Sequence, residues 1–228
     1  MHSLVYFYST SEKIAQNVLL LQQWKKLYPN GIIHLELAST QDKAVRAAII
    51  EKIAPLVDSI GLNERESLDA LEIVDEKLFA KVKNKKLSVP MLFDILKIIK
   101  DKTKTPRVQL HMFGLYITMQ NKGFTIAPEA NKRGMILAAT VAAAKCSIGK
   151  LENYADLLVM KGNGVSNYSI KALNDLADYL KQPELIYKGI TLADDEEIIA
   201  VPTILVDKPV TLVGMGDTIS SVSLVGAR

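Results

Sequence analysis

The sequence contains a single cysteine, Cys146, in 228 residues. One thiol excludes a disulfide framework and a metal site built from several cysteines. Its alanine-rich, apolar surroundings are typical of a small packed side chain. Long apolar runs are also missing: the longest, residues 135–144, is shorter than the roughly 20 residues of a membrane-spanning helix. The amino-terminal residues lack the basic start and apolar stretch of a secretory signal, so we expect a cytoplasmic protein without a membrane partner.

A strong charge of either sign is absent as well. The formal net charge is +3, and lysines gather only at residues 81–86 and 97–104. Such runs are typical of a solvated face, so we expect no nucleic-acid partner. The chain also lacks the Gly-x-x-x-x-Gly-Lys-Ser/Thr phosphate loop and the His-Arg-Asp loop of protein kinases. These absences exclude the two commonest classes of nucleotide-dependent phosphotransferase.

What is present is an alternation of short β-rich runs with helical patterns. It predicts one α/β domain over residues 1–228, a layered fold with a largely parallel sheet flanked by helices. A loop is expected after Val74. We expect strands at residues 32–38, 56–62, 108–113, 115–119, 123–126, 184–188, 198–206 and 210–213, and helices at residues 42–53, 91–99, 131–148, 152–160, 170–180 and 218–226, with another opening at Asn63.

The carboxy-terminal turn of Gly214, Met215, Gly216 and Asp217 lies between an expected strand and an expected helix. Glycines let the backbone approach a ligand closely, and the start of a helix offers N–H groups to an anion. Asp217 would then act as a base beside a phosphate. An alternative stays open, in which Asp217 is only the N-cap of the helix.

Two other polar pairs fall at expected strand ends, where α/β folds bind ligands. His34 and Glu36 lie on one side of a strand, where they could hold a water-bound metal or form a paired polar couple. Asn63 and Glu66 have the spacing of a capping box. They could also orient waters around a magnesium ion, and the two roles are compatible.

Together these segments resemble the ADP-dependent sugar kinases, the glucokinases and phosphofructokinases of the ribokinase-like fold. The resemblance rests on three segments in the family's order and spacing, supported by residues 108–113 and 201–203, and it extends over nearly the whole chain. The three are His-Leu-Glu-Leu-Ala-Ser at residues 34–39, Gly-Leu-Asn-Glu-Arg-Glu at 61–66 and Val-Gly-Met-Gly-Asp-Thr-Ile-Ser-Ser at 213–221.

The resemblance implies phosphate transfer from ADP to a sugar hydroxyl, with Mg²⁺ as cofactor. Asp217 would be the catalytic base, and the amides of Gly214, Met215 and Gly216 the anion hole. The implied metal residues are His34, Glu36, Asn63 and Glu66, and the implied nucleotide-binding residues are His111, Val201, Pro202 and Val213. The partners would be ADP or AMP and a hexose or hexose phosphate, with glucose favoured over fructose 6-phosphate because residues 34–39 and 61–64 resemble the animal glucokinase.

Members of that family are about twice as long as this chain, which resembles their C-terminal half. His2-Ser3-Leu4 resembles the middle of a strand-end motif in relatives. The remaining half carries the lid and most sugar contacts, so an exposed strand edge would require that half or a second copy as a cover. A non-catalytic nucleotide-binding or scaffold domain is the alternative to an active kinase.

Overall fold

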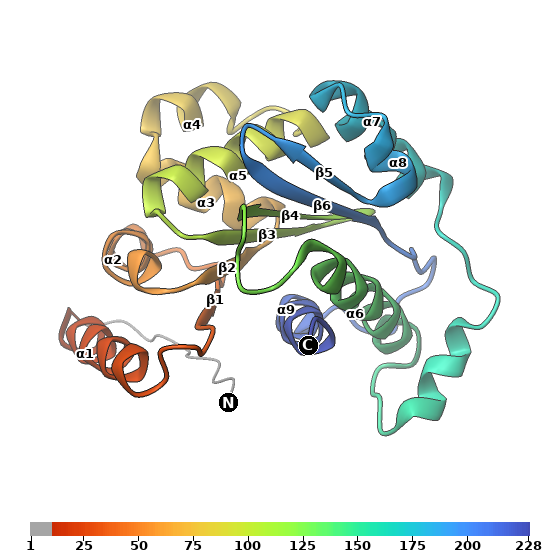
Figure 1. Ribbon diagram of the computed structural model, residues 1–228, viewed down its shortest axis with the longest axis horizontal. Coiled ribbons are helices and arrows are strands. Elements are labelled where there is room, and N and C mark those ends of the chain that lie inside the picture. Colours follow the sequence, from red (N-terminus) through yellow and green to blue (C-terminus); the bar gives the residue numbers. More distant parts are fainter. Residues whose placement is uncertain (1–10) are drawn as a thin grey trace. The chain divides into compact units, whose positions relative to one another are not determined.

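The computed structural model describes residues 11–228 (Figure 1). Two compact units make up the chain, one reaching to Leu110 and the other running from His111 to Arg228. The segment His2-Ser3-Leu4 lies outside the described residues. Within the described part, no helix combines the length and apolar composition that crossing a bilayer requires.

The first unit is built on parallel strands. Strand β1 (His34–Glu36) pairs with β2 (Ser59–Leu62), and β2 pairs with β3 (Arg107–Met112), whose last two residues belong to the second unit. The predicted strands at 32–38, 56–62 and 108–113 are therefore confirmed, with the first two shortened. The parallel pairing expected from the sequence is found in this unit.

Helices of the first unit surround these strands, and α3 packs against both β2 and α5 (Figure 1). The helix expected at 42–53 is confirmed with a change of type: it is capped by Asp42, is α-helical to Ala48 and is a π-helix over Ile49–Ile53. One prediction was wrong. The loop expected after Val74 contains a helix that Asp75 caps. The helices are α1 (Ser11–Leu27), α2 (Lys43–Ala48), α3 (Glu64–Val74), α4 (Glu76–Val82) and α5 (Val89–Thr103).

The strands of the second unit are antiparallel. β6 (Glu196–Pro202) lies between β4 (Leu115–Asn121) and β5 (Ile190–Ala193). Asp194 and Asp195 connect β5 to β6 with φ angles of 50° and 63°. Asp and Asn tolerate this left-handed region better than other non-glycine residues, which suits them to a tight hairpin turn. The β4 and β6 strands were predicted from the sequence, whereas β5 was not.

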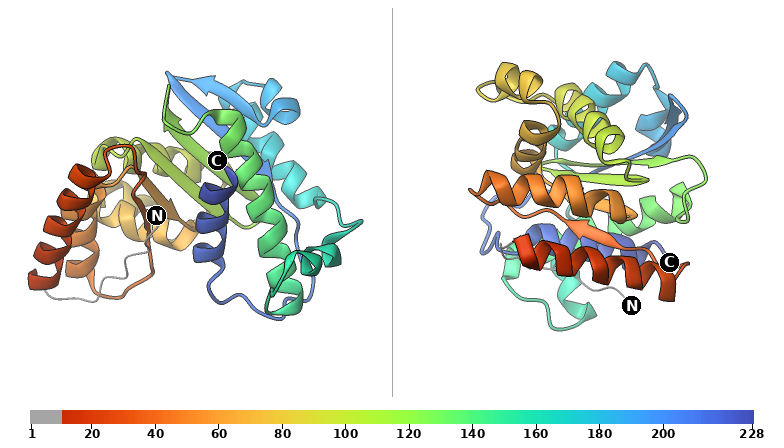
Figure 2. Two further views of the ribbon diagram at one scale, coloured as in Figure 1. Left: turned by 60° about the horizontal axis from the view of Figure 1, so that its bottom comes forward. Right: turned by 90° about the vertical axis from the view of Figure 1, so that its left-hand side faces the viewer.

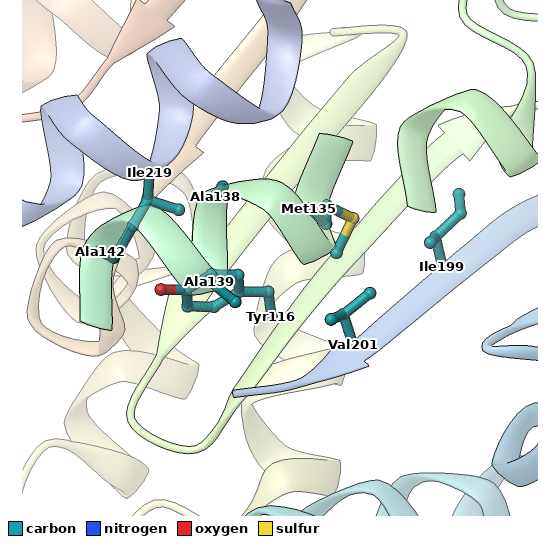
Figure 3. Packing of buried hydrophobic residues seen from close by; sticks show 8 residues of the cluster. All are labelled: Tyr116, Met135, Ala138, Ala139, Ala142, Ile199, Val201 and Ile219. Atoms are coloured by element: carbon teal, nitrogen blue, oxygen red, sulfur yellow. The ribbon is translucent and has the colours of Figure 1, made fainter. Parts of the chain in front are cut away.

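Helices α6 (Pro128–Ile148) and α9 (Met215–Gly226) pack side by side along the second unit (Figure 2). A hydrophobic cluster joins them to the strands (Figure 3). It is formed by Tyr116, Met135, Ala138, Ala139, Ala142, Ile199, Val201 and Ile219. The alanines keep side chains short where the two helices meet, so the close packing expected of residues 131–148 is confirmed.

The remaining helices of this unit are shorter than α6. α7 (Asn167–Leu180) packs against β4, β6 and α8 (Glu184–Lys188). The segment predicted as a helix at 152–160 forms a 3₁₀-helix, Tyr154–Met160, with its own capping box. The fold is thus α/β, with parallel pairing in the first unit and antiparallel pairing in the second.

Three predicted strands of the second unit were wrong. Residues 184–188 form α8, because Pro183 begins it and Gly189, in the left-handed region, ends it. Residues 123–126 form a turn that leads into α6. Residues 210–213 form a loop with a bend at Val210 and a turn at Val213, and the N–H of Val210 donates to the carbonyl oxygen of Cys146 at 2.8 Å.

Candidate functional site

The turn at Gly214 ends the loop and begins α9. Gly214 is the N-cap of the helix and has φ 65° and ψ 28°, a left-handed conformation in which glycine is unstrained. Asp217 lies in the first turn of α9 and is half-buried. The alternative that Asp217 is the N-cap is therefore excluded, since Gly214 occupies that position.

The backbone N–H groups at this end of α9 have the geometry of an anion site. The first four N–H groups of an α-helix have no acceptor within the helix, and here they belong to residues 214–217. Glycine at the N-cap has no side chain that could accept from them. The hydroxyl of Thr218 donates to the carbonyl oxygen of Gly214 at 2.8 Å, which fixes the turn. The predicted anion-hole residues, Gly214, Met215 and Gly216, thus share one helix start with Asp217.

His34 and Glu36 contact each other in the first unit. Nε2 of His34 lies 3.3 Å from Oε2 of Glu36, and Nδ1 lies 2.9 Å from Oγ of Ser59 on the neighbouring strand. Both side chains are largely buried, with 10% and 6% of their surface exposed. Both ring nitrogens of His34 therefore have partners, and one of these is the Glu36 carboxylate.

Asn63 and Glu66 form the capping box that their spacing predicted. Oδ1 of Asn63 accepts from the backbone N–H groups of Arg65 and Glu66 at 2.9 and 3.0 Å, and Oε2 of Glu66 accepts from the N–H of Asn63 at 2.9 Å. The hydroxyl of Ser39 also donates to Oε1 of Glu66 at 3.4 Å. The structural role of this motif is therefore confirmed.

The first unit also brings two of the predicted metal residues together. A carboxylate oxygen of Glu36 lies within 4.8 Å of one from Glu66. Carboxylate oxygens are the protein ligands that Mg²⁺ prefers, and two of them at this separation fit one ion. The oxygen of Asn63 already accepts two N–H bonds, which fills both of its lone pairs. Asn63 therefore fits a role as holder of Glu66 better than that of a direct ligand.

Sequence reasoning missed Arg107, which supports the same group of side chains. Its Nη1 donates to Oγ of Ser59 at 2.7 Å, and Nη2 donates to Gln109. Burial lowers the pKa of this guanidinium to about 9, and the nearby Glu36 opposes that shift. Arg107, Gln109 and His111 alternate along this strand with apolar residues, and this pattern in the sequence indicates a polar face.

The predicted nucleotide-binding residues have different environments in the second unit. The His111 side chain is buried, and so is that of Val201, which packs in the cluster below α6 (Figure 3). Pro202 is half-buried at the end of β6, opposite Leu115. Val213 is 82% exposed beside the Gly214 turn. Val213 alone among these four has most of its side chain exposed to solvent.

Two solved structures with a similar fold come from ADP-dependent kinases. The last common ancestor of ADP-dependent phosphofructokinases from Methanosarcinales has a TM-score of 0.87 and 29% identity, over 95% of this chain and 46% of that one. An ADP-dependent kinase in complex with fructose-6-phosphate and ADPβS has a TM-score of 0.86 and 30% identity, over 95% and 48%. The predicted fold class, a ribokinase-like α/β arrangement, is thereby confirmed.

The sequence points to the same kinases. Residues 1–226 match the ADP-specific Phosphofructokinase/Glucokinase conserved region, and the chain belongs to that family. Its relatives include an ADP-specific phosphofructokinase of Methanosarcina acetivorans, 27% identical over 91% of this chain and 44% of that protein. Another is an ADP-dependent glucose/glucosamine kinase of Pyrococcus abyssi, 31% identical over 99% and 47%. The chain spans about half the length of these relatives.

Proposed function

We propose that this chain carries the catalytic base and the anion hole of an ADP-dependent sugar kinase. One observation supports the proposal above all: Asp217 lies in the first turn of α9, directly after the left-handed Gly214, so a carboxylate and the helix-start amides share one turn. Relatives named as ADP-specific phosphofructokinases and ADP-dependent glucose/glucosamine kinases supply the reaction class.

In the proposed reaction, the Asp217 carboxylate takes the proton from a sugar hydroxyl. The hydroxyl oxygen attacks the β-phosphorus of ADP, the bond between that phosphorus and the bridging oxygen breaks, and AMP leaves with the bridging oxygen. Negative charge on the transferred phosphoryl oxygens is stabilised by the amides of residues 214–217, because fixed donors do not need to reorganise during the reaction. Val213 and Pro202 would lie beside the nucleotide, together with the backbone of Val201 and with His111.

Glu36 and Glu66 are the proposed holders of Mg²⁺, with His34 orienting Glu36 and Asn63 orienting Glu66. A bound magnesium ion supplies positive charge to the phosphates of the nucleotide. The chain's own contribution is to fix the two carboxylates: Glu36 by the contact with His34, and Glu66 by the hydrogen bond from the N–H of Asn63.

Glucose is the proposed acceptor, and fructose 6-phosphate is the competing one. Residues 34–39 and 61–64 carry the preference for glucose, whereas the solved kinase complex named above contains fructose-6-phosphate. The two sugars can be distinguished directly by measuring AMP formed from ADP in the presence of each. The assay is run with the chain alone and with the chain combined with the other half of a relative.

The proposal is tested by titrating the purified chain with ADP in the presence of Mg²⁺ and by assaying sugar-dependent AMP formation. We expect ADP binding, and a loss of transfer in Asp217→Asn with the fold retained. Asp207→Asn is the matched control, since this residue is exposed on the loop before the turn. Absence of ADP binding by the folded wild-type chain refutes the proposal. If ADP binds but no AMP forms, both with the chain alone and with the chain combined with the other half of a relative, the result supports a non-catalytic nucleotide-binding domain instead.

A further inference from the structure

A lysine from another helix holds the Gly214 turn. Lys145 lies in the last turn of α6 and is half-buried. Its Nζ donates to the carbonyl oxygen of Gly214 at 3.2 Å and to Oγ1 of Thr218 at 2.9 Å. The two acceptors are themselves joined, since the Thr218 hydroxyl donates to the same carbonyl oxygen. One ammonium group therefore connects α6 to the N-cap and to the first turn of α9.

Lys145 contacts neutral acceptors. Both of its partners are neutral oxygen atoms, and no carboxylate among the described residues pairs with it. The last turn of α6 favours a cation, whereas the partial positive charge at the start of α9 disfavours one, and an anion bound there would offset that repulsion. Lys150, which follows the end of α6, forms instead an exposed pair with Glu152.

The same end of α6 also fixes the loop that precedes the turn. The N–H of Val210 donates to the carbonyl oxygen of Cys146, the residue after Lys145, at 2.8 Å. A Cβ added to Gly149 would lie 3.3 Å from the side chain of Val210. The loop is thus attached to α6 before the turn by Val210 and at the turn by Lys145. Between these two attachments the backbone must reach the left-handed conformation of Gly214.

We propose that Lys145 is a positioning residue for phosphate transfer. It holds the Gly214 turn so that the first amides of α9 point to the phosphate being transferred, and its positive charge offsets part of the negative charge of that phosphate. This inference rests on the proposed function, because it assigns a role at the same anion hole. It adds a residue from a different helix, 69 positions away from Gly214 in the sequence.

The test compares ADP with AMP, which lacks the phosphate that the anion hole would bind. Wild-type chain, Lys145→Met, Lys145→Arg and the matched control Lys150→Met are titrated with each nucleotide by calorimetry. We expect Lys145→Met to weaken ADP binding at least about tenfold, the range of one lost charge-assisted hydrogen bond, and to leave AMP binding within about twofold. Lys145→Arg should recover part of the ADP affinity, because it keeps the charge and the donors. Lys150→Met should match the wild type for both nucleotides.

Two outcomes separate this inference from the proposed function. If wild-type chain prefers ADP but Lys145→Met changes the affinities for ADP and AMP equally, or changes neither, the role of Lys145 is refuted and the proposed function stands. If wild-type chain binds neither nucleotide, the proposed function fails and the role of Lys145 fails with it. Should Lys145→Met not fold, Thr218→Val removes one of the two acceptors, and the same selective loss of ADP affinity is expected from it.

Discussion

Gly134 on α6 faces the carbonyl oxygen of Ser223 on α9 with no space for a side chain: an added Cβ would lie 2.0 Å from that oxygen. The contact is with backbone, which cannot rotate away as a flexible side chain could. We therefore expect Gly134→Ala to lower the free energy of unfolding by at least about 3 kcal/mol, at the upper end of overpacking effects. Urea unfolding followed by circular dichroism measures the change.

The matched control for this prediction is Gly164→Ala. A Cβ at Gly164 meets nothing within 4 Å, and the residue does not occupy the left-handed region. Its unfolding free energy should stay within about 0.5 kcal/mol of the wild type. Equal stability of Gly134→Ala and wild type would show that α6 and α9 do not pack as closely as described.

Gly214→Ala should weaken nucleotide binding as well as stability. Gly214 has φ +65°, and its added Cβ would lie 3.3 Å from Nζ of Lys145. Gly123 has φ +76° but meets nothing within 4 Å, so Gly123→Ala tests the backbone penalty alone. Both variants should lose about 1 kcal/mol of stability. Only Gly214→Ala should lose ADP affinity, as measured by calorimetric titration, and an equal loss in Gly123→Ala would contradict the assignment of the turn.

The capping boxes at Asn63 and Asn153 allow a paired test of the metal proposal. Each asparagine accepts from backbone N–H groups at a helix start, so each change to alanine should cost about 1 kcal/mol of stability. The Asn63 side chain accepts from the backbone N–H of Glu66 and so orders the first turn of α3, which carries this proposed Mg²⁺ ligand, whereas the turn capped by Asn153 carries no proposed ligand. The rise in melting temperature on adding Mg²⁺ with ADP should therefore shrink in Asn63→Ala and persist in Asn153→Ala. A rise of the same size in both variants would count against the magnesium site.

Asp156 predicts a pH dependence of stability. Its carboxylate accepts from the backbone N–H groups of Glu152 and Asn153, at 2.6 and 3.0 Å, which lowers its pKa below the ordinary value of 3.8. The unfolded chain therefore binds the proton more readily, so the stabilisation is present above pH 3.8 and is lost as the pH falls through the lower folded pKa. The stability difference between wild type and Asp156→Asn should be constant near pH 6 and decrease below pH 3.8. An unchanged difference at low pH would exclude this role.

Much of the fold was predictable because local signals and long-range packing agree. Residues 131–148 have small side chains at helical spacing, and they form most of α6. The strand prediction for residues 184–188 was wrong. Ile and Tyr favour strands, but Pro183 and Gly189 mark the two ends of a short helix. The strand prediction for residues 210–213 was wrong for a different reason. Their apolar side chains lie exposed in a loop, which composition alone cannot distinguish from a buried strand.

The candidate site was predictable only where its residues are close in the sequence. Asn63 and Glu66 are three residues apart and carry a helix-start signature that can be read directly. Arg107 and Ser59 are 48 residues apart, and the strand register brings them together. Lys145 is likewise 69 residues from Gly214, on a helix whose orientation depends on tertiary packing. Such contacts require the pairing of distant elements, which one sequence does not specify.

The close contact between α6 and α9 has a thermodynamic consequence for any ligand at the start of α9. A Cβ added to Gly226 would lie 3.1 Å from Cα of Gly134, so the two backbones are already in near contact and one helix cannot slide past the other. The contact fixes α9 against α6, and Lys145 and Thr218 hold the Gly214 turn at the other end of α9, so the turn has its conformation without a ligand. A flexible phosphate-binding loop loses conformational entropy each time it binds, whereas this turn has lost that entropy once, when the chain folded.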